Sequence, residues 1–191
     1  MNGALLDELL GRHSVGPKHL VEPAPDDAQL ALMIEAALRA PDHAGLRPWR
    51  FAAVRGAARE KLADLFVAAA RRAGKDEAGV ELDRERALRA PLTLAVIARI
   101  DAGHPEVPAH EQWAAVGGAL ANFMNAVHLL GFGGKMLSGH KARDPGLIGA
   151  FCAPGETLLG WIALGTPVRA GAPRRRSAED AIKDWPSSEQ A

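Results

Sequence analysis

Three polar segments of the chain hold the residues best suited to chemistry. They are Arg12-His13-Ser14, the stretch from Arg39 to Trp49, and the stretch from Gly133 to Lys141. An arginine next to a short hydroxyl donor suits a phosphate group. A plainer interpretation of the first segment stays open, because the helix dipole also favours basic residues at the C-terminal end of a helix.

Several common catalytic patterns are absent from the sequence. Gly131-Phe132-Gly133-Gly134 follows a predicted helix, and the third glycine of a dinucleotide-binding fingerprint would fall at Met136. There is no P-loop, and no serine stands in a nucleophile elbow. The seven histidines do not pair at metal-ligand spacing, so we expect no metal site. The single cysteine, Cys152, has no charged neighbour and is expected to be a small core residue.

The elements that would position these segments are helices mixed with strands. Hydrophobic periodicity and capping residues predict helices over 4–11, from an N-cap at Asp26 to just before Pro41, over 59–72, 77–89 and about 111–130, and a short one from Pro145. Strands are predicted over 50–55, 92–100, 135–137 and 157–164. This order, without a regular βαβ rhythm, predicts a three-layer α+β fold with a sheet between helical layers. About three or four strands make a thin sheet, which a partner subunit could complete.

The long helix predicted over 111–130 is unusually small on one side. Its small residues are Gly117, Gly118, Ala119, Ala121 and Ala126. Small side chains let another helix approach closely. Both a dimer-facing helix and a tightly packed core helix within one chain therefore agree with this pattern.

Length and composition indicate a single domain. The 191 residues are 48% hydrophobic and 24% charged, and we place one domain at residues 1–170 and a polar C-terminal tail at 171–191, with Arg174, Arg175 and Arg176 expected to be solvated. The 23 basic residues balance 23 acidic ones, so no nucleic-acid partner is expected. No signal peptide and no apolar run of about 18 residues are visible, so no membrane partner is expected. One cysteine excludes an intramolecular disulfide and favours the cytoplasm.

Four groups of short motifs occur in a characteristic order along the chain. They are Arg12-His13-Ser14; Pro41-Asp42-His43 with Pro48-Trp49-Arg50-Phe51; Gly131-Phe132-Gly133-Gly134 with Ser138-Gly139; and Leu164-Gly165-Thr166-Pro167. Together they resemble the nitroreductase family, and in particular its small bacterial NAD(P)H nitroreductases. The resemblance extends from about residue 4 to residue 168.

The resemblance implies an FMN-dependent oxidoreductase that works as an obligate homodimer, with FMN at the subunit interface. NADH or NADPH would reduce the flavin and leave, and a small-molecule electron acceptor, such as a nitroaromatic compound or a quinone, would take the electrons in the same pocket. The flavin would carry the chemistry, which agrees with the lack of a catalytic side chain. The implied FMN contacts are Arg12, His13 and Ser14 around the phosphate and ribityl chain, Arg39 and His43 from the second segment, and Gly133, Gly134, Met136, Leu137 and Ser138 from the third.

Two positions depart from the family pattern. Relatives often have Trp-Arg-Ser where this chain has Met136-Leu137-Ser138, so a cation near the phosphate is missing; Lys135, Lys141 and Arg143 are the candidates to replace it. Arg47 stands where many relatives have glutamine, and it could favour anionic substrates or be a surface residue. Two alternatives follow: a flavoenzyme for another reduction on the same fold, and a dimeric binding or regulatory protein of this fold that lacks reductase activity.

Overall fold

The computed structural model describes residues 3–169, 171, 173, 181, 182 and 185. Its centre is a five-stranded antiparallel sheet. The strands are β1 (Leu20–Val21), β2 (Trp49–Val54), β3 (Leu92–Ala98), β4 (Gly133–Leu137) and β5 (Thr157–Pro167). The order along the sheet is β1-β5-β3-β2, and β4 also pairs with β5. The long strand β5 therefore pairs with three other strands, β1, β3 and β4.

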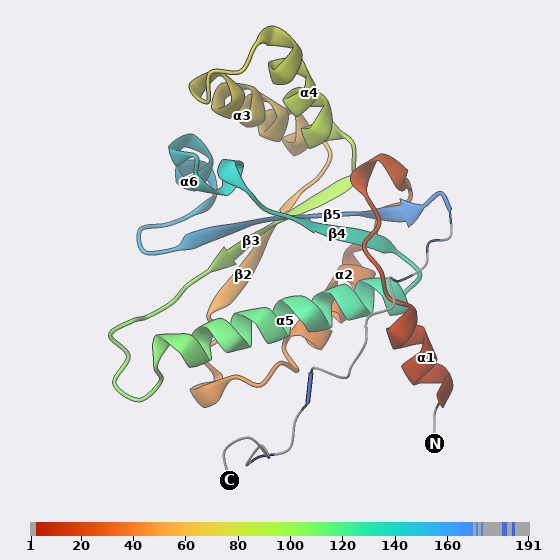
Figure 1. Ribbon diagram of the computed structural model, residues 1–191, viewed down its shortest axis with the longest axis vertical. Coiled ribbons are helices and arrows are strands. Elements are labelled where there is room, and N and C mark those ends of the chain that lie inside the picture. Colours follow the sequence, from red (N-terminus) through yellow and green to blue (C-terminus); the bar gives the residue numbers. More distant parts are fainter. Residues whose placement is uncertain (1–2, 170, 172, 174–180, 183–184, 186–191) are drawn as a thin grey trace.

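The described residues form six α-helices. They are α1 (Gly3–Gly11), α2 (Asp27–Ala37), α3 (Ala58–Arg72), α4 (Glu77–Leu88), α5 (Ala109–Leu129) and α6 (Pro145–Phe151). Five of them cover the two faces of the sheet, and α1 lies beyond the end of α5 (Figure 1). Helices α3, α4 and α6 lie on one side of the sheet, and α2 and α5 lie on the other. This arrangement confirms the predicted three-layer α+β fold.

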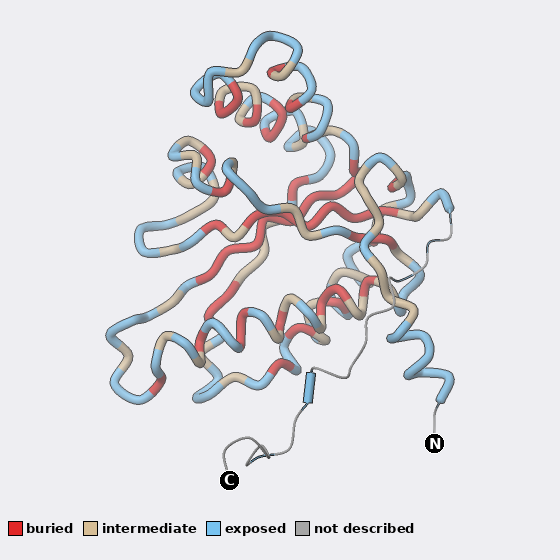
Figure 2. The backbone as a smooth tube through the Cα atoms, in the orientation of Figure 1, coloured by how far each residue is buried: buried red, intermediate tan, exposed pale blue. Residues whose placement is uncertain are grey.

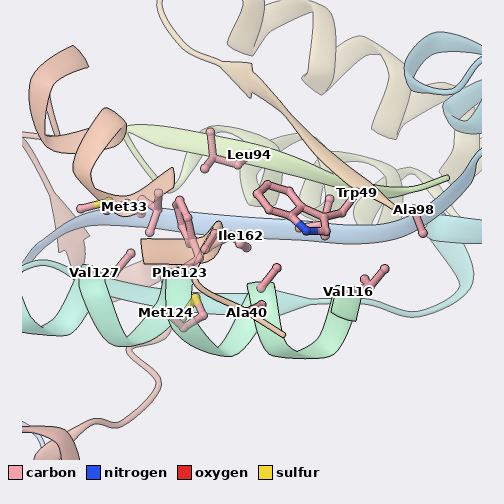
Figure 3. Close-up of a cluster of buried hydrophobic side chains, with 14 of the residues drawn as sticks. Met33, Ala40, Trp49, Leu94, Ala98, Val116, Phe123, Met124, Val127 and Ile162 are labelled. Atoms are coloured by element: carbon pink, nitrogen blue, oxygen red, sulfur yellow. The ribbon is translucent and has the colours of Figure 1, made fainter. Parts of the chain in front are cut away.

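Strand β3 is the centre of the core, as its continuous apolar sequence predicted. All seven of its residues are buried, and the buried residues of Figure 2 concentrate along the sheet and the helix faces turned toward it. Because successive side chains of a strand point to opposite faces, Leu94 packs on the α2–α5 side while Ile97 packs toward α3. Figure 3 shows the α2–α5 side, where Phe123 of α5 lies beside Met33 of α2 under the sheet.

Local sequence signals set several helix ends as predicted. The Asp26 carboxylate accepts a hydrogen bond from Gln29 N at 2.8 Å, and the Gln29 side chain accepts one from Asp26 N at 3.0 Å, which completes the capping box. Asp144 caps α6 by accepting from Leu147 N, with Pro145 at the first helical position. These bonds satisfy backbone donors that the first helical turn leaves unpaired.

The sheet is larger than the sequence predicted. Strand β1 was not predicted, because two residues are too short to show a periodicity of two. It pairs with the end of β5, which continues to Pro167 instead of ending at Leu164. Strand β4 begins at Gly133, two residues before the predicted start at Lys135. The prediction began too late because glycine gives no strand signal even where it pairs in a ladder.

The small residues of α5 divide between two surroundings. Ala119 is buried, and a Cβ at Gly118 would lie 3.2 Å from the Ala40 Cβ, so this side packs within the chain. Gly117 and Ala121 are exposed in the described chain, and a Cβ at Gly117 would meet no heavy atom within 4 Å. The core-helix interpretation therefore holds for one side of α5, and the other side is open.

Candidate functional site

The segment after α1 runs along the outer edge of β4. Val15 N donates to the carbonyl of Gly134 at 3.0 Å, while the opposite edge of β4 pairs with β5. Backbone groups of successive strand residues face alternate edges, so the N–H and carbonyl of Met136 face the same outer edge as those of Gly134. Within the part of the chain that the structure describes, no strand pairs with this edge, which leaves donors and acceptors available there.

A hollow of about 320 Å³ lies where this segment meets α5, and we call it the Arg12 hollow. Its lining residues are Arg12, Ser14, Gly117, Leu120, Ala121, Met124, Asn125 and Met136. None of them is acidic, and Arg12 makes no ion pair with any carboxylate of the described residues. A cation without a counter-ion, a hydroxyl and an apolar wall suit a ligand with an anionic group next to an apolar body.

His13 points away from this hollow. Its Nδ1 lies 3.1 Å from the Gly11 carbonyl oxygen, and its ring meets the ring of His128 edge-on at 6.2 Å between centroids. It lines a different depression together with Phe132 and Arg169. The described chain therefore brings Arg12 and Ser14 together but places the His13 side chain elsewhere.

A second hollow, of about 330 Å³, lies on the opposite face of β4, and we call it the Trp161 hollow. Met136 and Leu137 are neighbours in the strand and so point to opposite faces, which places Met136 in the Arg12 hollow and Leu137 in the Trp161 hollow. The lining residues are Pro17, Leu62, Phe66, Arg86, Ala87, Arg89, Ala90, Thr93, Leu137, Ser138, His140, Lys141, Trp161 and Ala163. The end of β4 is thus the partition between two hollows.

Basic side chains outnumber acidic ones around the Trp161 hollow. Arg86, Arg89 and Lys141 line it, and no aspartate or glutamate does. Beside it lies the fully buried Asp83, whose oxygens are 2.6 Å from Lys75 Nζ, 2.8 Å from Lys141 Nζ and 3.1 Å from Arg86 Nη1. Three cations therefore share one buried carboxylate.

The buried carboxylate of Asp83 stays ionised because of these partners. Burial alone would raise its pKa, but hydrogen bonds from Lys141 and Lys75, the charge of Lys141 and a hydrogen bond from Arg86 lower the pKa to about 2. The cluster ties α4 and the α3–α4 connection to Lys141, which follows β4. It therefore fixes one wall of the Trp161 hollow.

One polar atom at the Trp161 hollow lacks a partner. Trp161 is 4% exposed, and its indole N–H has no acceptor among the described residues. Leaving a buried donor unpaired costs about 1–3 kcal/mol.

Gly133 and Gly134 are explained by packing within the chain. A Cβ at Gly133 would lie 2.7 Å from Leu20 Cδ2, and a Cβ at Gly134 would lie 3.0 Å from Leu164 Cδ2 and 3.2 Å from Met124 Cε. Both glycines are buried. They let β4 approach both α5 and the segment that follows α1 closely. This close approach places the Arg12 and Met136 side chains on one hollow.

Arg39 and His43 lie outside both hollows. Arg39 is exposed just after α2. His43 is also exposed, and its Nδ1 is 2.8 Å from the Glu111 carboxylate in the first turn of α5. Within one chain, these two predicted site residues do not join Arg12 and Ser14 in a single cavity.

The three candidate replacements for the missing cation differ in their surroundings. Lys141 is 13% exposed and paired with Asp83. Lys135 and Arg143 are exposed, and none of the three lines the Arg12 hollow. Arg47 is exposed as well; its φ is 47°, and its carbonyl accepts a hydrogen bond from Arg99 at 3.1 Å.

Among the lining residues that sequence reasoning missed, Asn125, Arg86 and Arg89 are polar. Asn125 lies one helical turn after Ala121 on α5, and that i, i+4 spacing could have placed it on the same face. Arg86 and Arg89 of the α4 region gave no signal, because charges on a surface helix are usually solvated.

Cys152 is half-buried, and burial raises the pKa of its thiol, so it is a protonated thiol at neutral pH.

Neither a metal site nor a membrane-spanning helix is observed in the described residues. No group of three or more histidine, cysteine, aspartate or glutamate side chains is placed to hold a metal ion there. Among the helices of that same part, none has the length and apolar character needed to cross a membrane. Most of the predicted tail, including Arg174–Arg176, lies outside the described residues.

Comparison with known proteins gives consistent matches over nearly the whole chain. The model of the Nitroreductase family matches residues 9–166. The Escherichia coli K12 protein YdjA, provisionally named an NAD(P)H nitroreductase, is 35% identical over 163 residues, which cover 85% of this chain and 87% of YdjA.

Solved structures show the same fold. A nitroreductase-like family protein from Bacillus cereus aligns with a TM-score of 0.80 at 21% identity, covering 96% of each chain. A provisionally named nitroreductase from Desulfovibrio desulfuricans, solved in complex with FMN, aligns with a TM-score of 0.72 at 22% identity, covering 97% of this chain and 99% of that one.

Proposed function

The chain belongs to the nitroreductase family, and from this premise we propose that it is an FMN-dependent oxidoreductase that takes electrons from NADH or NADPH. The observation that carries the proposal is the Arg12 hollow. It combines a cation without a described counter-ion, a serine hydroxyl and apolar side chains next to the outer edge of β4.

The residues present fit FMN. The flavin phosphate carries close to two negative charges, which Arg12 and the Ser14 hydroxyl would bind. Met124 and Met136 offer an apolar surface to the ring system. The outward N–H of Met136 is a donor for the polar edge of the ring, where negative charge develops on reduction. The backbone at this edge of β4 would therefore donate the hydrogen bond to the reduced ring that a side chain would otherwise have to supply.

The remaining predicted contacts suit a homodimer. Arg39 and His43 do not reach the Arg12 hollow in one chain, so in this proposal they contact the flavin held mainly by the partner. Gly117 and Ala121 present a small, exposed surface of α5 that a second copy could approach closely. The His13 side chain would contribute by positioning the segment through His128, and its backbone would face the flavin.

When bound in the Arg12 hollow, FMN would supply the redox chemistry, which is hydride acceptance from NAD(P)H and electron transfer to an acceptor in a ping-pong cycle. The protein binds and orients the cofactor, excludes water and supplies hydrogen bonds at the ring edge. No proton donor among the described side chains is required for this role. Nitroaromatic compounds and quinones are the acceptors we propose to test first.

The deciding experiment is an absorbance scan of the purified protein, as isolated and after incubation with FMN. We expect flavin bands that bleach under anaerobic NADH or NADPH, and the donor that bleaches them faster is the preferred one. Bands that do not bleach with either donor would contradict the oxidoreductase function. A protein that stays colourless after incubation with FMN would instead leave a binding or regulatory role for the fold.

A further inference from the structure

We propose that a hollow formed by the segment after α2 binds a phosphate group of the nicotinamide donor, with Arg47 as the residue that recognises it. The hollow measures about 480 Å³, and we call it the Arg47 hollow. The inference rests on the proposed function and adds a specificity-determining residue to it. The lining residues of the hollow are Leu38, Ala40, Asp42, Gly45, Leu46, Arg47 and Arg99.

The charge of the hollow favours an anion. Arg47 and Arg99 line it, and Asp42 is its one acidic lining residue. The Asp42 carboxylate already accepts a hydrogen bond from Arg47 N at 2.7 Å. Neither arginine forms an ion pair with a carboxylate of the described residues. Two guanidinium groups against one carboxylate leave a net positive charge, and their planar geometry matches the oxygens of a phosphate.

The backbone at Arg47 does not by itself require an arginine. Its φ is 47°, in the left-handed region that residues with a large side chain seldom adopt. Two hydrogen bonds hold it there, because Arg47 N donates to Asp42 and the Arg47 carbonyl oxygen accepts from Arg99 Nη2 at 3.1 Å. Both bonds use backbone atoms of residue 47, so they would form with another side chain as well. The exposed guanidinium group of Arg47 is therefore not needed for this turn and can turn toward a ligand.

Arg99 anchors the same segment and adds a second cation to it. The hydrogen bonds of its side chain to the described residues all use Nη2, which donates to the carbonyl oxygens of Arg47 and, at 3.4 Å, of Trp49. A guanidinium group carries five N–H donors, so further donors are left for the oxygens of a ligand. Arg99 therefore positions Arg47 and places a second positive charge beside it.

The position of the hollow connects it to the flavin site. Arg47 lies in the segment that carries Arg39 and His43, which in the proposed function contact the flavin held mainly by the partner. The donor and the acceptor would still react in turn in one pocket over that flavin. The nicotinamide ring of the donor is joined through a ribose to a diphosphate and an adenosine, so its phosphates extend past the ring toward the loops around the flavin. A small acceptor does not need to reach the hollow.

The half-reaction with the donor tests the inference without any acceptor present. We would mix FMN-saturated protein anaerobically with increasing concentrations of NADPH or NADH and follow the bleaching of the flavin bands. The concentration dependence of the bleaching rate gives the dissociation constant of the donor. Arg47→Gln should raise this constant at least about tenfold for NADPH, because it removes a charge-assisted hydrogen bond. The bleaching rate at saturation should stay near that of wild type, since the contact is remote from the reacting atoms.

The two donors identify which phosphate is bound. A loss of affinity for NADPH alone assigns the hollow to the 2′-phosphate, and an equal loss for NADPH and NADH assigns it to the diphosphate. Calorimetric titration of the oxidised, FMN-saturated protein with NADP⁺ and with NAD⁺ should show the same pattern without turnover. Arg47→Lys keeps the positive charge and should recover part of the affinity.

A matched control separates this contact from a general loss of positive charge. Lys61→Gln removes one exposed cation of α3, on the other side of the sheet, and Lys61 lines none of the hollows. Its dissociation constants for both donors should equal those of wild type. Arg47→Gln keeps the two backbone hydrogen bonds of residue 47, and its melting temperature would verify that it folds.

The outcomes of the two proposals are distinguishable. Failure of the proposed function would appear as wild-type protein without flavin bands or with flavin that neither donor bleaches. The present inference would be overturned, in a protein that bleaches normally, by unchanged donor affinity in Arg47→Gln or by an equal loss in Lys61→Gln. A loss in Arg47→Gln that is confined to the second half-reaction, with 4-nitrobenzoate as the acceptor, would assign Arg47 to the acceptor and would also overturn it.

Discussion

At the scale of single residues, Arg12 is the side chain on which the proposed cofactor site depends most. Arg12→Ala should raise the dissociation constant of FMN by about ten- to a hundredfold, because a hydrogen bond to a charged group contributes about 1.5–3 kcal/mol. Quenching of FMN fluorescence on titration measures this directly. The melting temperature of the flavin-free protein should hardly change, since Arg12 has no ion pair among the described residues.

A control distinguishes a specific contact from a general loss of positive charge. Lys18→Ala removes an exposed cation of the same segment that does not line the Arg12 hollow. Its FMN affinity should equal that of wild type. An equal loss of affinity in both variants would assign no phosphate contact to Arg12.

Asp83 is a buried carboxylate that stabilises the α3–α4 region through three ion pairs. Asp83→Asn should lower the free energy of unfolding at neutral pH by about 3 kcal/mol, because removing one partner of a buried ionic cluster leaves the other charges uncompensated. Chemical denaturation measures the loss. Asp64→Asn, an exposed partner of Arg84, is the control and should cost less than about 1 kcal/mol.

The pH dependence of this difference follows from the lowered pKa of Asp83. Its ordinary pKa is 3.8 and its pKa in the folded protein is about 2, so the unfolded state binds the proton first as the pH falls. The stabilisation is therefore complete above about pH 4 and is lost as the pH falls toward 2. The difference in the free energy of unfolding between wild type and Asp83→Asn should therefore narrow over this pH range. A difference that stays constant would contradict a lowered pKa of Asp83.

At the scale of elements, the end of β4 packs closely against a glycine of β5. Gly160 has a φ of 139°, and a Cβ there would lie 2.1 Å from the carbonyl oxygen of Leu137. It stands next to the irregularity where the β3–β5 register shifts between Val96 and Ile97. The position therefore requires glycine for its backbone conformation and for its contact with β4.

Gly160→Ala should destabilise the protein by about 3 kcal/mol, because strain at a position of positive φ adds to a backbone clash. It should also weaken FMN binding, since Leu137 and Ser138 would be displaced. Gly149→Ala in α6 is the control: a Cβ there meets nothing within 4 Å, and alanine favours a helix by about 1 kcal/mol over glycine. An unchanged melting temperature for Gly160→Ala would refute the packing argument.

At the scale of the whole molecule, the exposed side of α5 is where we expect the second subunit. A Cβ at Gly117 meets no heavy atom within 4 Å in the described chain, and leucine improves helix propensity, so a monomer should tolerate Gly117→Leu. A partner helix packed on this side would be pushed away. Sedimentation velocity should show a shift from dimer to monomer. The sedimentation coefficient is the readout and FMN affinity is not, because Gly117 also lines the Arg12 hollow.

The matched variant places a leucine on a different surface. Gly149→Leu adds the same side chain at an open position of α6, on the other side of the sheet, and should leave the sedimentation coefficient unchanged. A dimer that persists in Gly117→Leu would move the proposed interface away from this side of α5.

The sequence by itself determined most elements, the helix caps and the family. These features depend on local signals: the apolar run of β3, the box of Asp26 and Gln29 and each short motif are visible within a few residues, and the order of the motifs is read along the chain. The same local logic failed for β1, which exists only because the distant end of β5 offers it a pairing edge.

Only the tertiary structure decided how the predicted site residues are distributed. It brought Arg12, Ser14 and Met136 onto one hollow, placed Leu137 and Ser138 on another, and turned His13 toward His128. It also buried Asp83 among Lys75, Arg86 and Lys141. The reason is physical: side-chain direction along a strand follows from periodicity, but which distant charge enters a cavity depends on how the helices pack across the sheet.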